Sequence, residues 1–335
     1  MSFLFSLEDK DIEKLEEYIE KEGNVNLVNT WTPLHYACKQ SKPENIIEIL
    51  LLAGANPNAQ SNYTPLHIGC IYQTSKEAIE LLLEFGADIN LKEGKTPRET
   101  CHNKELEKLL QEPLLPFQKD FLSFLESEDL YDLEIKCLDG AIKAHKLIIE
   151  TRMNGVDVNN MLEEFKKISI QNAIIFIRFI YSGFAEDPNV LIEIGTKLKI
   201  SQNWLDKKAG KANLAKDFKE LLQNDLNKDF SIIVEDEYFR VHKVILASRS
   251  NLFRGLFLSV NDDSNEVTDH FGASKQSMKK FIEFIYFGEL SFSSSTDETI
   301  IEMGNLVDFY QINERDFQIC LAKNKRKFYQ TKKFD

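Results

Sequence analysis

Apolar residues in the first third of the chain form two runs, and each run ends at a glycine. Residues 46–53 and 78–85 are rich in Ile and Leu, and Gly54 and Gly86 follow them. A glycine directly after an apolar helical run is typical of a helix that ends in the left-handed region. Each run therefore predicts a buried helix, and the step of 32 residues between them predicts a repeated unit.

A short motif recurs with the same step, one helix earlier in each unit. Thr-Pro-Leu-His stands at residues 32–35 and again at 64–67, and Thr-Pro-Arg follows at 96–98. Thr can cap the free N–H groups of a helix start, and Pro in the first helical position loses no hydrogen bond. His35 and His67 are predicted to tie each turn to its neighbour through both ring nitrogens. A period near 33 residues indicates a stacked solenoid.

The helix cap, the apolar second helix and a Gly-Ala-Asn/Asp turn together resemble the ankyrin repeat. The resemblance implies about four units over residues 1–112, with residues 1–30 and 95–112 as atypical end units. It also implies protein binding at the turn tips and the concave face of the first helices. The candidate client contacts are Trp31, Tyr36, Lys39, Tyr63, Ile68 and Tyr72. Exposed aromatic side chains are favoured interface anchors, although Trp31 and Tyr63 could instead cover neighbouring turns.

A second, unrelated repeat occupies the rest of the chain. Lys-Asp-Phe at residues 119–121 returns at 216–218, and His145 returns as His242, each 97 residues later. Residues 229–241 alternate as a short hairpin would, with acidic turn residues in the middle. A period near 100 residues indicates a duplicated globular domain.

An Asp before a hairpin, then Val-His-Lys leading into Leu-Ala-Ser-Arg-Ser, then Phe-Ile-Tyr-x-Gly, resembles the BTB/POZ domain. Residues 213–322 are expected to form one such domain and residues 116–212 a divergent copy. The copy lacks the apolar segment found at residues 251–257, so its second helix is predicted to be short or absent. The framework residues of the two copies are Asp132, His145, Lys146, Asp229, His242 and Lys243.

Each copy begins with an amphipathic helix, at residues 117–125 and 214–222. In the BTB family this helix builds the dimer interface, so the resemblance implies self-association, either within one chain or between chains. The alternative is that each helix packs on its own domain. Asp229 and Lys243 could also form the charged pocket that receives co-repressor peptides in some BTB domains.

A motif in the first copy suggests a further partner. BTB domains that recruit the ubiquitin-ligase scaffold cullin-3 commonly carry apolar-x-Glu in the loop before the strand that precedes Phe-Ile-Tyr. Met161, Leu162 and Glu163 stand at that place, before a strand expected at residues 165–170. The alternative is that Met161 and Leu162 pack on their own core. The nearest counterpart in the second copy is Val-Asn-Asp at residues 260–262.

Composition narrows the class of partner. The net charge is −13, with 41 Lys and Arg against 54 Asp and Glu, which argues against general binding to nucleic acids or anionic membranes. No apolar run approaches the roughly 18–20 residues of a membrane span. The five cysteines lack paired spacing, which indicates free thiols in a reducing compartment. No phosphate loop, metal-ligand cluster or nucleophile motif occurs, so no catalytic residue, cofactor or metal is expected.

The sequence thus predicts a multidomain, helix-rich protein: an all-α ankyrin solenoid, two α+β BTB/POZ domains, and a basic tail at residues 323–335. The predicted function is an intracellular protein-interaction adaptor. Its ankyrin repeats bind a client, while its BTB domains assemble chains or dock cullin-3 as part of an E3 ubiquitin ligase. The alternative is a scaffold or transcriptional co-regulator that uses the BTB domains for self-association alone. The expected location is the cytoplasm, with nuclear residence left open.

Overall fold

The computed structural model divides the chain into two compact units. It describes residues 12–22, 25–26, 31–40, 43–110, 116–185, 187–225, 227–259, 265–269, 272–290, 292 and 295–331. One unit comprises residues 1–115 together with 318–335, and the other comprises residues 116–317. Because each unit has its own core, each is described by itself.

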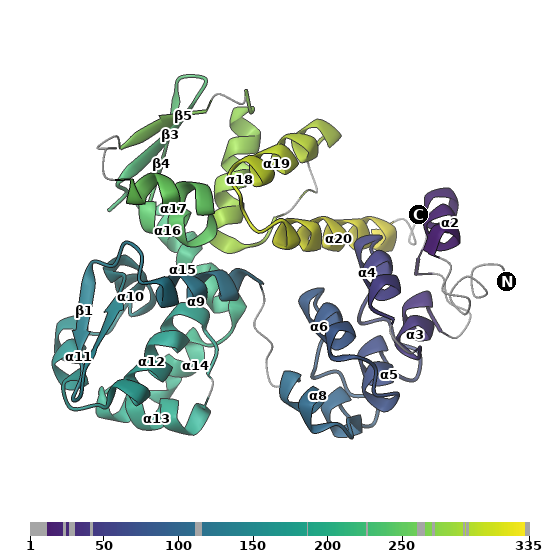
Figure 1. Ribbon diagram of the computed structural model, residues 1–335, viewed down its shortest axis with the longest axis horizontal. Helices are drawn as coiled ribbons and strands as arrows, with labels where there is room; N and C mark the ends of the chain where they lie inside the picture. The colour runs from purple at the N-terminus through teal and green to yellow at the C-terminus, as the bar shows by residue number, and fades with distance from the viewer. Residues whose placement is uncertain are drawn as a thin grey trace. The chain divides into compact units, whose positions relative to one another are not determined.

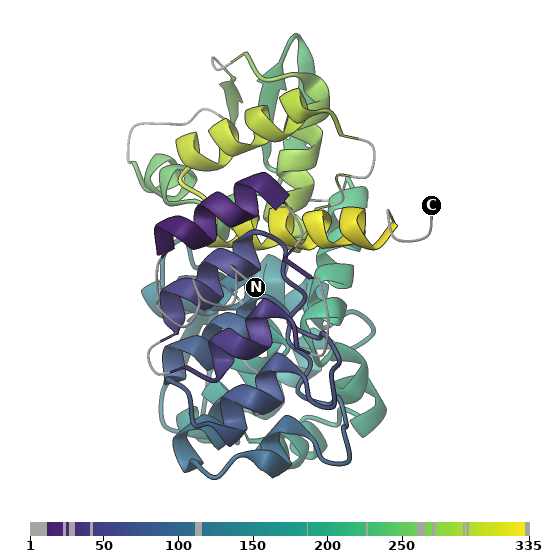
Figure 2. The same cartoon turned by 90° about the vertical axis from the view of Figure 1, so that its right-hand side faces the viewer.

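The first unit is built from short helices that stack in sequence order (Figures 1 and 2). They are α2 (Ile12–Glu22), α3 (Pro33–Cys38), α4 (Glu44–Leu52), α5 (Pro65–Ile71), α6 (Lys76–Glu84), α7 (Pro97–Thr100) and α8 (Lys104–Leu109). From α3 onward the helices form three pairs, and the first helices of neighbouring pairs pack on one another.

The predicted helix starts and ends are confirmed. Thr32, Thr64 and Thr96 each occupy the N-cap of a first helix, and Pro follows in each case. Gly54 and Gly86 have φ angles of 94° and 89°, in the left-handed region that a residue with a Cβ rarely adopts. The repeated sequence motif is therefore a repeated helix boundary.

The predicted histidine bridges are also confirmed. In each case Nδ1 lies against the capping Thr of its own unit, at 2.7 Å for His35 and 2.8 Å for His67. The other nitrogen reaches the next unit: Nε2 of His35 is 2.8 Å from the Tyr63 carbonyl, and Nε2 of His67 is 2.9 Å from the Lys95 carbonyl. Both rings are fully buried and hydrogen-bonded at both nitrogens.

A second set of bridges between units uses asparagine. The Asn58 side chain donates to the Gly86 carbonyl at 2.8 Å and accepts from the Asp88 N–H at 2.7 Å. Asn26 makes the same two bonds one unit earlier, at 3.0 and 2.8 Å. Sequence reasoning missed this ladder, although its signal was present as Asn at positions 26 and 58, the same 32 residues apart.

The final helix, α20 (Glu314–Thr331), is longer than the sequence suggested. It continues past Ala322 through much of the segment expected to be a basic tail, and residues 332–335 lie outside the described part of the chain. Ile319 and Ala322 belong to the buried cluster that holds the first unit together.

The second unit begins with what we call the leading half, residues 116–210. Its two strands pair antiparallel, with Leu133 opposite Ala144. Its elements are α9 (Pro116–Ser127), β1 (Leu133–Lys136), β2 (Ala141–Ala144), α10 (Lys146–Arg152), α11 (Val158–Phe165), α12 (Ile170–Ser182), α13 (Pro188–Lys197) and α14 (Gln202–Lys208).

The trailing half, residues 211–317, follows the same order. Its elements are α15 (Lys211–Gln223), β3 (Phe230–Val234), β4 (Glu237–Val241), α16 (Lys243–Arg249), α17 (Asn251–Leu258), β5 (Glu266–Thr268), α18 (Lys275–Phe287), α19 (Asp297–Phe309) and the start of α20. The sheet order is β4-β3-β5, with β5 parallel to β3. The described residues of the leading half hold no counterpart of β5.

Two expectations about the leading half are wrong. Its second helix is neither short nor absent, because α11 is eight residues long, as is α17. Residues 165–170 do not form a strand: Phe165 ends α11 and Ile170 begins α12. The physical reason is local, since the Asp157 side chain caps the helix at the Asn160 N–H and Met161 and Phe165, one turn apart, are both buried.

Candidate functional site

Four aromatic side chains lie in or next to the first helices of the ankyrin-like pairs, and two of them are exposed. Tyr63 is 36% exposed and Tyr72 is 48% exposed, while Trp31 and Tyr36 are half-buried. The Trp31 and Tyr36 rings meet edge to face at 5.3 Å, and Lys39 Nζ lies 5.4 Å above the Tyr72 ring. We call these five residues the aromatic surface.

One predicted client contact is not on this surface. Ile68 is only 2% exposed, so the expectation that it faces a partner is wrong. The reason is that α5 packs on α3, α6 and α7, which leaves little of its side open. Ile71, three residues later, is 36% exposed.

The two leading helices of the second unit meet at a pair of equivalent phenylalanines. The Phe121 ring of α9 stacks on the Phe218 ring of α15, with centroids 4.7 Å apart and planes 10° apart. These residues are 97 positions apart, so each copy presents the same residue to the other. Both rings are fully buried. A contact between equivalent residues is what a twofold axis produces.

Two ion pairs obey the same symmetry. Arg249 of α16, in the trailing half, pairs with Asp120 of α9, in the leading half. Arg152 of α10, in the leading half, pairs with Asp217 of α15, in the trailing half. Both arginine side chains are fully buried. Each half therefore lays its first helix on the other half and receives the other's first helix in return.

The surroundings of these ion pairs differ. At the first, Arg249 also lies 2.9 Å from a second carboxylate, Asp316. At the other, Asp217 also lies 2.9 Å from a second cation, Lys208. We call Asp120, Arg249 and Asp316 the acid-rich end, and Asp217, Arg152 and Lys208 the base-rich end.

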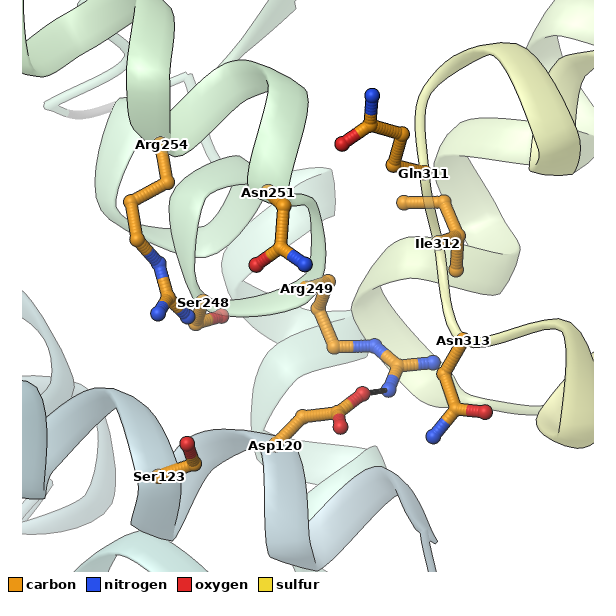
Figure 3. Close-up of a pocket in the computed structure, with 9 residues that line it drawn as sticks. All are labelled: Asp120, Ser123, Ser248, Arg249, Asn251, Arg254, Gln311, Ile312 and Asn313. Carbon is orange, nitrogen blue, oxygen red and sulfur yellow. Dashed lines mark hydrogen bonds and ion pairs between the residues drawn. The ribbon is translucent and has the colours of Figure 1, made fainter.

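A pocket of about 370 Å³ opens at the acid-rich end. In Figure 3 the Asp120 carboxylate points from α9 to Arg249, while Asn251 and Gln311 face the same space from the trailing half. Burial raises the pKa of Asp120 to about 6; the Arg249 charge opposes that rise and the Asp316 charge adds to it. The pocket lining is Asp120, Ser123, Ser248, Arg249, Asn251, Arg254, Gln311, Ile312 and Asn313.

The base-rich end has an equivalent pocket, of about 500 Å³. Three lining residues are the counterparts of acid-rich lining residues 97 positions away: Asp217 of Asp120, Glu220 of Ser123, and Asn154 of Asn251. The rest of the lining is Trp204, Lys207, Lys208, Asn213 and Lys216. The twofold relation thus extends from the helices and the Arg–Asp pairs to the cavities, while the charges around those pairs differ.

The predicted framework aspartates cap helices. The Asp132 carboxylate accepts the Lys146 N–H at 2.7 Å, and the Asp229 carboxylate accepts the Lys243 N–H at 2.8 Å. A carboxylate at a helix start satisfies free N–H groups and the helix dipole. Lys243 itself reaches across to Asn265 at 2.8 Å.

The framework histidines are buried among hydrogen bonds. Nδ1 of His145 lies 2.7 Å from the Tyr181 hydroxyl, and Nδ1 of His242 lies 2.7 Å from the Tyr286 hydroxyl. Nε2 of His145 is 2.7 Å from the Asp129 carbonyl. Burial lowers the pKa of His145, which favours the neutral ring. This arrangement fixes the hairpin to α12 and α18.

The candidate cullin contacts lie within α11 and not in a loop. Met161 is 1% exposed and packs in its own core, Leu162 is half-buried, and Glu163 is exposed and paired with Lys166 at 2.6 Å. A partner could therefore reach Leu162 and Glu163 without any change in the fold. The counterpart at residues 260–262 falls outside the described residues.

In the described ranges of the chain, no three His, Cys, Asp or Glu side chains are grouped as a metal site requires. Each helix in those ranges is too short or too polar to cross a bilayer.

Comparison with known families identifies two regions. A model of ankyrin repeats (3 copies) matches residues 4–93, and a model of the BTB/POZ domain matches residues 218–324. The chain therefore contains ankyrin repeats and a BTB/POZ domain, which are protein-interaction domains and not catalytic ones. Residues 116–212 lie outside both matches, so the expected tandem of two BTB/POZ domains is supported in its second member alone.

Curated relatives resemble part of the chain. Kelch-like protein 15 of Homo sapiens is 25% identical over 107 residues, which is 32% of this chain and 18% of that protein. BTB/POZ domain-containing protein 9 of Drosophila melanogaster is 25% identical over 125 residues, 37% of this chain and 17% of that protein. TD and POZ domain-containing protein 4 of Mus musculus is 36% identical over 85 residues, 25% of this chain and 23% of that protein. The chain thus spans about a fifth of the length of these relatives.

Proposed function

We propose that this chain is a protein-interaction adaptor: its ankyrin repeats bind a client protein, and its BTB part docks a cullin-3-type scaffold of an E3 ubiquitin ligase. The observation that carries the proposal is the presence of two kinds of protein-interaction domain in one chain, with Tyr63 and Tyr72 exposed on the ankyrin part. Catalysis would belong to the recruited ligase. Five free cysteines suit a reducing compartment such as the cytoplasm.

We further propose that residues 116–212 are a divergent second BTB/POZ domain. The support is residue by residue: the same Asp caps the same helix, and the same His meets a Tyr hydroxyl, in both halves. The chain order of helices and hairpin is also shared. The boundary between the two copies lies near Gly210, because α15 begins at Lys211.

The client site is tested on the aromatic surface. A photo-reactive residue placed at Tyr72 should cross-link a client protein, and Trp31→Ala should abolish the cross-link. The matched control is the same photo-reactive residue at Lys76, which is exposed at the start of a second helix. Equal labelling from both positions would contradict a client site on the first helices.

The cullin role is tested by mixing the full chain with the amino-terminal helical domain of a cullin-3 and weighing the complex by light scattering. Leu162→Ala and Glu163→Ala should weaken the complex about tenfold each, which corresponds to about 1.4 kcal/mol. Glu134→Ala, on the exposed side of β1, is the control. Full binding by both variants would refute the motif, and no complex at micromolar concentration would refute the ligase role.

The alternative is a scaffold whose BTB part serves assembly alone. One observation favours it: Met161, the apolar anchor of the expected motif, is committed to its own core. An anchor must enter a groove on the partner to contribute binding energy. Absence of a complex between the unmodified chain and the cullin domain in the mixing experiment would support this second function.

A further inference from the structure

We infer that the pairing faces of the second unit are closed within a single chain, so that the occupant of each face is the other half of the same molecule and not a second copy. The inference concerns the seam formed by α9, α10, α15 and α16. It goes beyond the proposed function, because it holds whether or not a cullin or a client binds.

The connection between the halves is the first argument. The last helix of the leading half, α14, ends at Lys208, and α15 begins at Lys211. Ala209 and Gly210 alone join them, and the Gly210 N–H donates to the Gly183 carbonyl at 2.8 Å. A Cβ on Gly183 would lie 3.0 Å from the Gly210 backbone. The start of α15 is therefore fastened to the leading half of its own chain.

Helix α15 is also part of the trailing half. It packs along α18 of that half while contacting α10 and α14 of the leading half. Its inward residues Leu214 and Phe218 are fully buried between them. Because two residues cannot span the distance to another molecule, the half that receives α15 and the half that owns it must belong to one chain.

Helix α9 closes the other side of the seam. Phe117 lies over the end of α18, where a Cβ on Gly288 would come within 2.6 Å of its ring. The Arg249 guanidinium lies 4.8 Å from the same ring, and the Arg254 guanidinium lies 5.0 Å from the Phe124 ring. Phe117, Phe121 and Phe124 are all fully buried. The apolar faces of both leading helices are thus already covered.

Covalent linkage favours pairing between the two halves of one chain over pairing with a half of a second chain. Two faces joined by a short connection meet at an effective concentration in the millimolar range, far above that of a free protein in solution. The chain should therefore behave, through this seam, as a monomer that contains its own pair. It carries one ankyrin stack for each pair of BTB-like halves.

The test is the mass of the purified full chain by light scattering, from low to high micromolar concentration. We expect one chain, 38.7 kDa, at every concentration. A co-expression experiment accompanies it: chains with two different tags should not co-purify. If the two tagged chains do co-purify, and Phe218→Glu abolishes this, the inference is overturned, because Phe218 lies at the seam.

The Phe218→Glu variant also distinguishes a dimer formed through the seam from a dimer formed through another surface. If the wild-type chain has twice the expected mass and Phe218→Glu halves it, pairing is between chains and the inference fails. If the doubled mass survives Phe218→Glu, the second copy binds at another surface and closure within the chain is supported. Lys219→Glu, on the exposed side of the same helix, is the control and should change neither result.

Discussion

The two ends of the seam have the same architecture and opposite electrostatics. At each end a buried arginine from one half holds an aspartate from the first helix of the other. The acid-rich end adds Asp316, so two carboxylates share one guanidinium; the base-rich end adds Lys208, so two cations share one carboxylate. The Arg–Asp pair is therefore common to both ends, whereas the charge around it differs.

The difference matters because the ends are buried. Removing a charge from water is costly, and a buried ion pair is stable only while each charge keeps its partners. At the acid-rich end one guanidinium pairs with two carboxylates, so its loss removes an ion-pair partner from both. At the base-rich end the loss of one cation leaves another in place.

The largest expected effect follows from this asymmetry. Arg249→Met should destabilise the second unit by about 3–5 kcal/mol, because Asp120 and Asp316 would remain as uncompensated buried charges. Arg152→Met should cost about 1–3 kcal/mol, because Lys208 still pairs with Asp217. Urea unfolding followed by circular dichroism measures both. An equal or reversed order would remove the distinction between the two ends.

The next effect is the response of the acid-rich end to pH. The folded-state pKa of Asp120 is about 6, above its ordinary value of 3.8. A raised pKa means that the stabilising contribution of this group is complete below about pH 4 and is lost as pH rises through about 6. The loss amounts to about 3 kcal/mol.

Other carboxylates titrate in the same pH range, so the contribution of Asp120 is obtained by comparing the wild type with a variant that lacks this carboxylate. The free energy of unfolding of the wild type minus that of Asp120→Asn should fall by about 2–3 kcal/mol from about pH 4 to about pH 7.5. Parallel pH profiles for the two proteins would show that Asp120 is not the titrating group.

A smaller effect is expected from the aromatic stack, which belongs to neither end of the seam. The Phe121–Phe218 stack lies between them, and a double-mutant cycle with Phe121→Leu and Phe218→Leu should give a coupling energy of about 0.5–1.5 kcal/mol. Thermal or urea unfolding of the four proteins provides it. A coupling energy near zero would mean that the two rings act independently and that the halves are held by the ion pairs.

The smallest effect tests the pocket linings. Ser123 at the acid-rich end corresponds to Glu220 at the base-rich end. Ser123→Glu should destabilise the unit by a few tenths of a kcal/mol, up to about 1, because it adds an exposed carboxylate one helical turn from Asp120. The effect should shrink in high salt. Glu220→Ser is the matched exchange, and an equal penalty there would argue against charge as the cause.

The repeats were predictable because they are marked by residues whose structural effect is local. Thr, Pro, His and Gly fix the ends of the ankyrin helices within a few residues, so His35 and His67 could be assigned their bridges from the sequence. The framework histidines could be located in the same way. The end of α20 was not assigned in this way, because residues 318–322 were expected in the second BTB/POZ domain and belong instead to the first unit.

The seam was not predictable to the same depth, because its contacts join residues far apart in the sequence. Asp120 and Asp217, and Arg152 and Arg249, were visible as pairs at the 97-residue step, but which Arg meets which Asp depends on the exchange of helices. The burial of Ile68 was missed for a related reason: the neighbouring helices, and not the periodicity of the residue's own helix, decide which side chains are covered. For Met161 the sequence left two interpretations open, partner contact and packing in its own core, and the structure shows the side chain buried.

The connection through Ala209 and Gly210 has a genetic consequence. In a dimer made of two chains, a defective copy can enter complexes with a normal one and disable it. Here both members of the pair are encoded in one reading frame and fold together, so defective and normal chains do not mix through the seam. A substitution at Arg152 or Arg249 should therefore behave as recessive in a cell that also makes the normal chain.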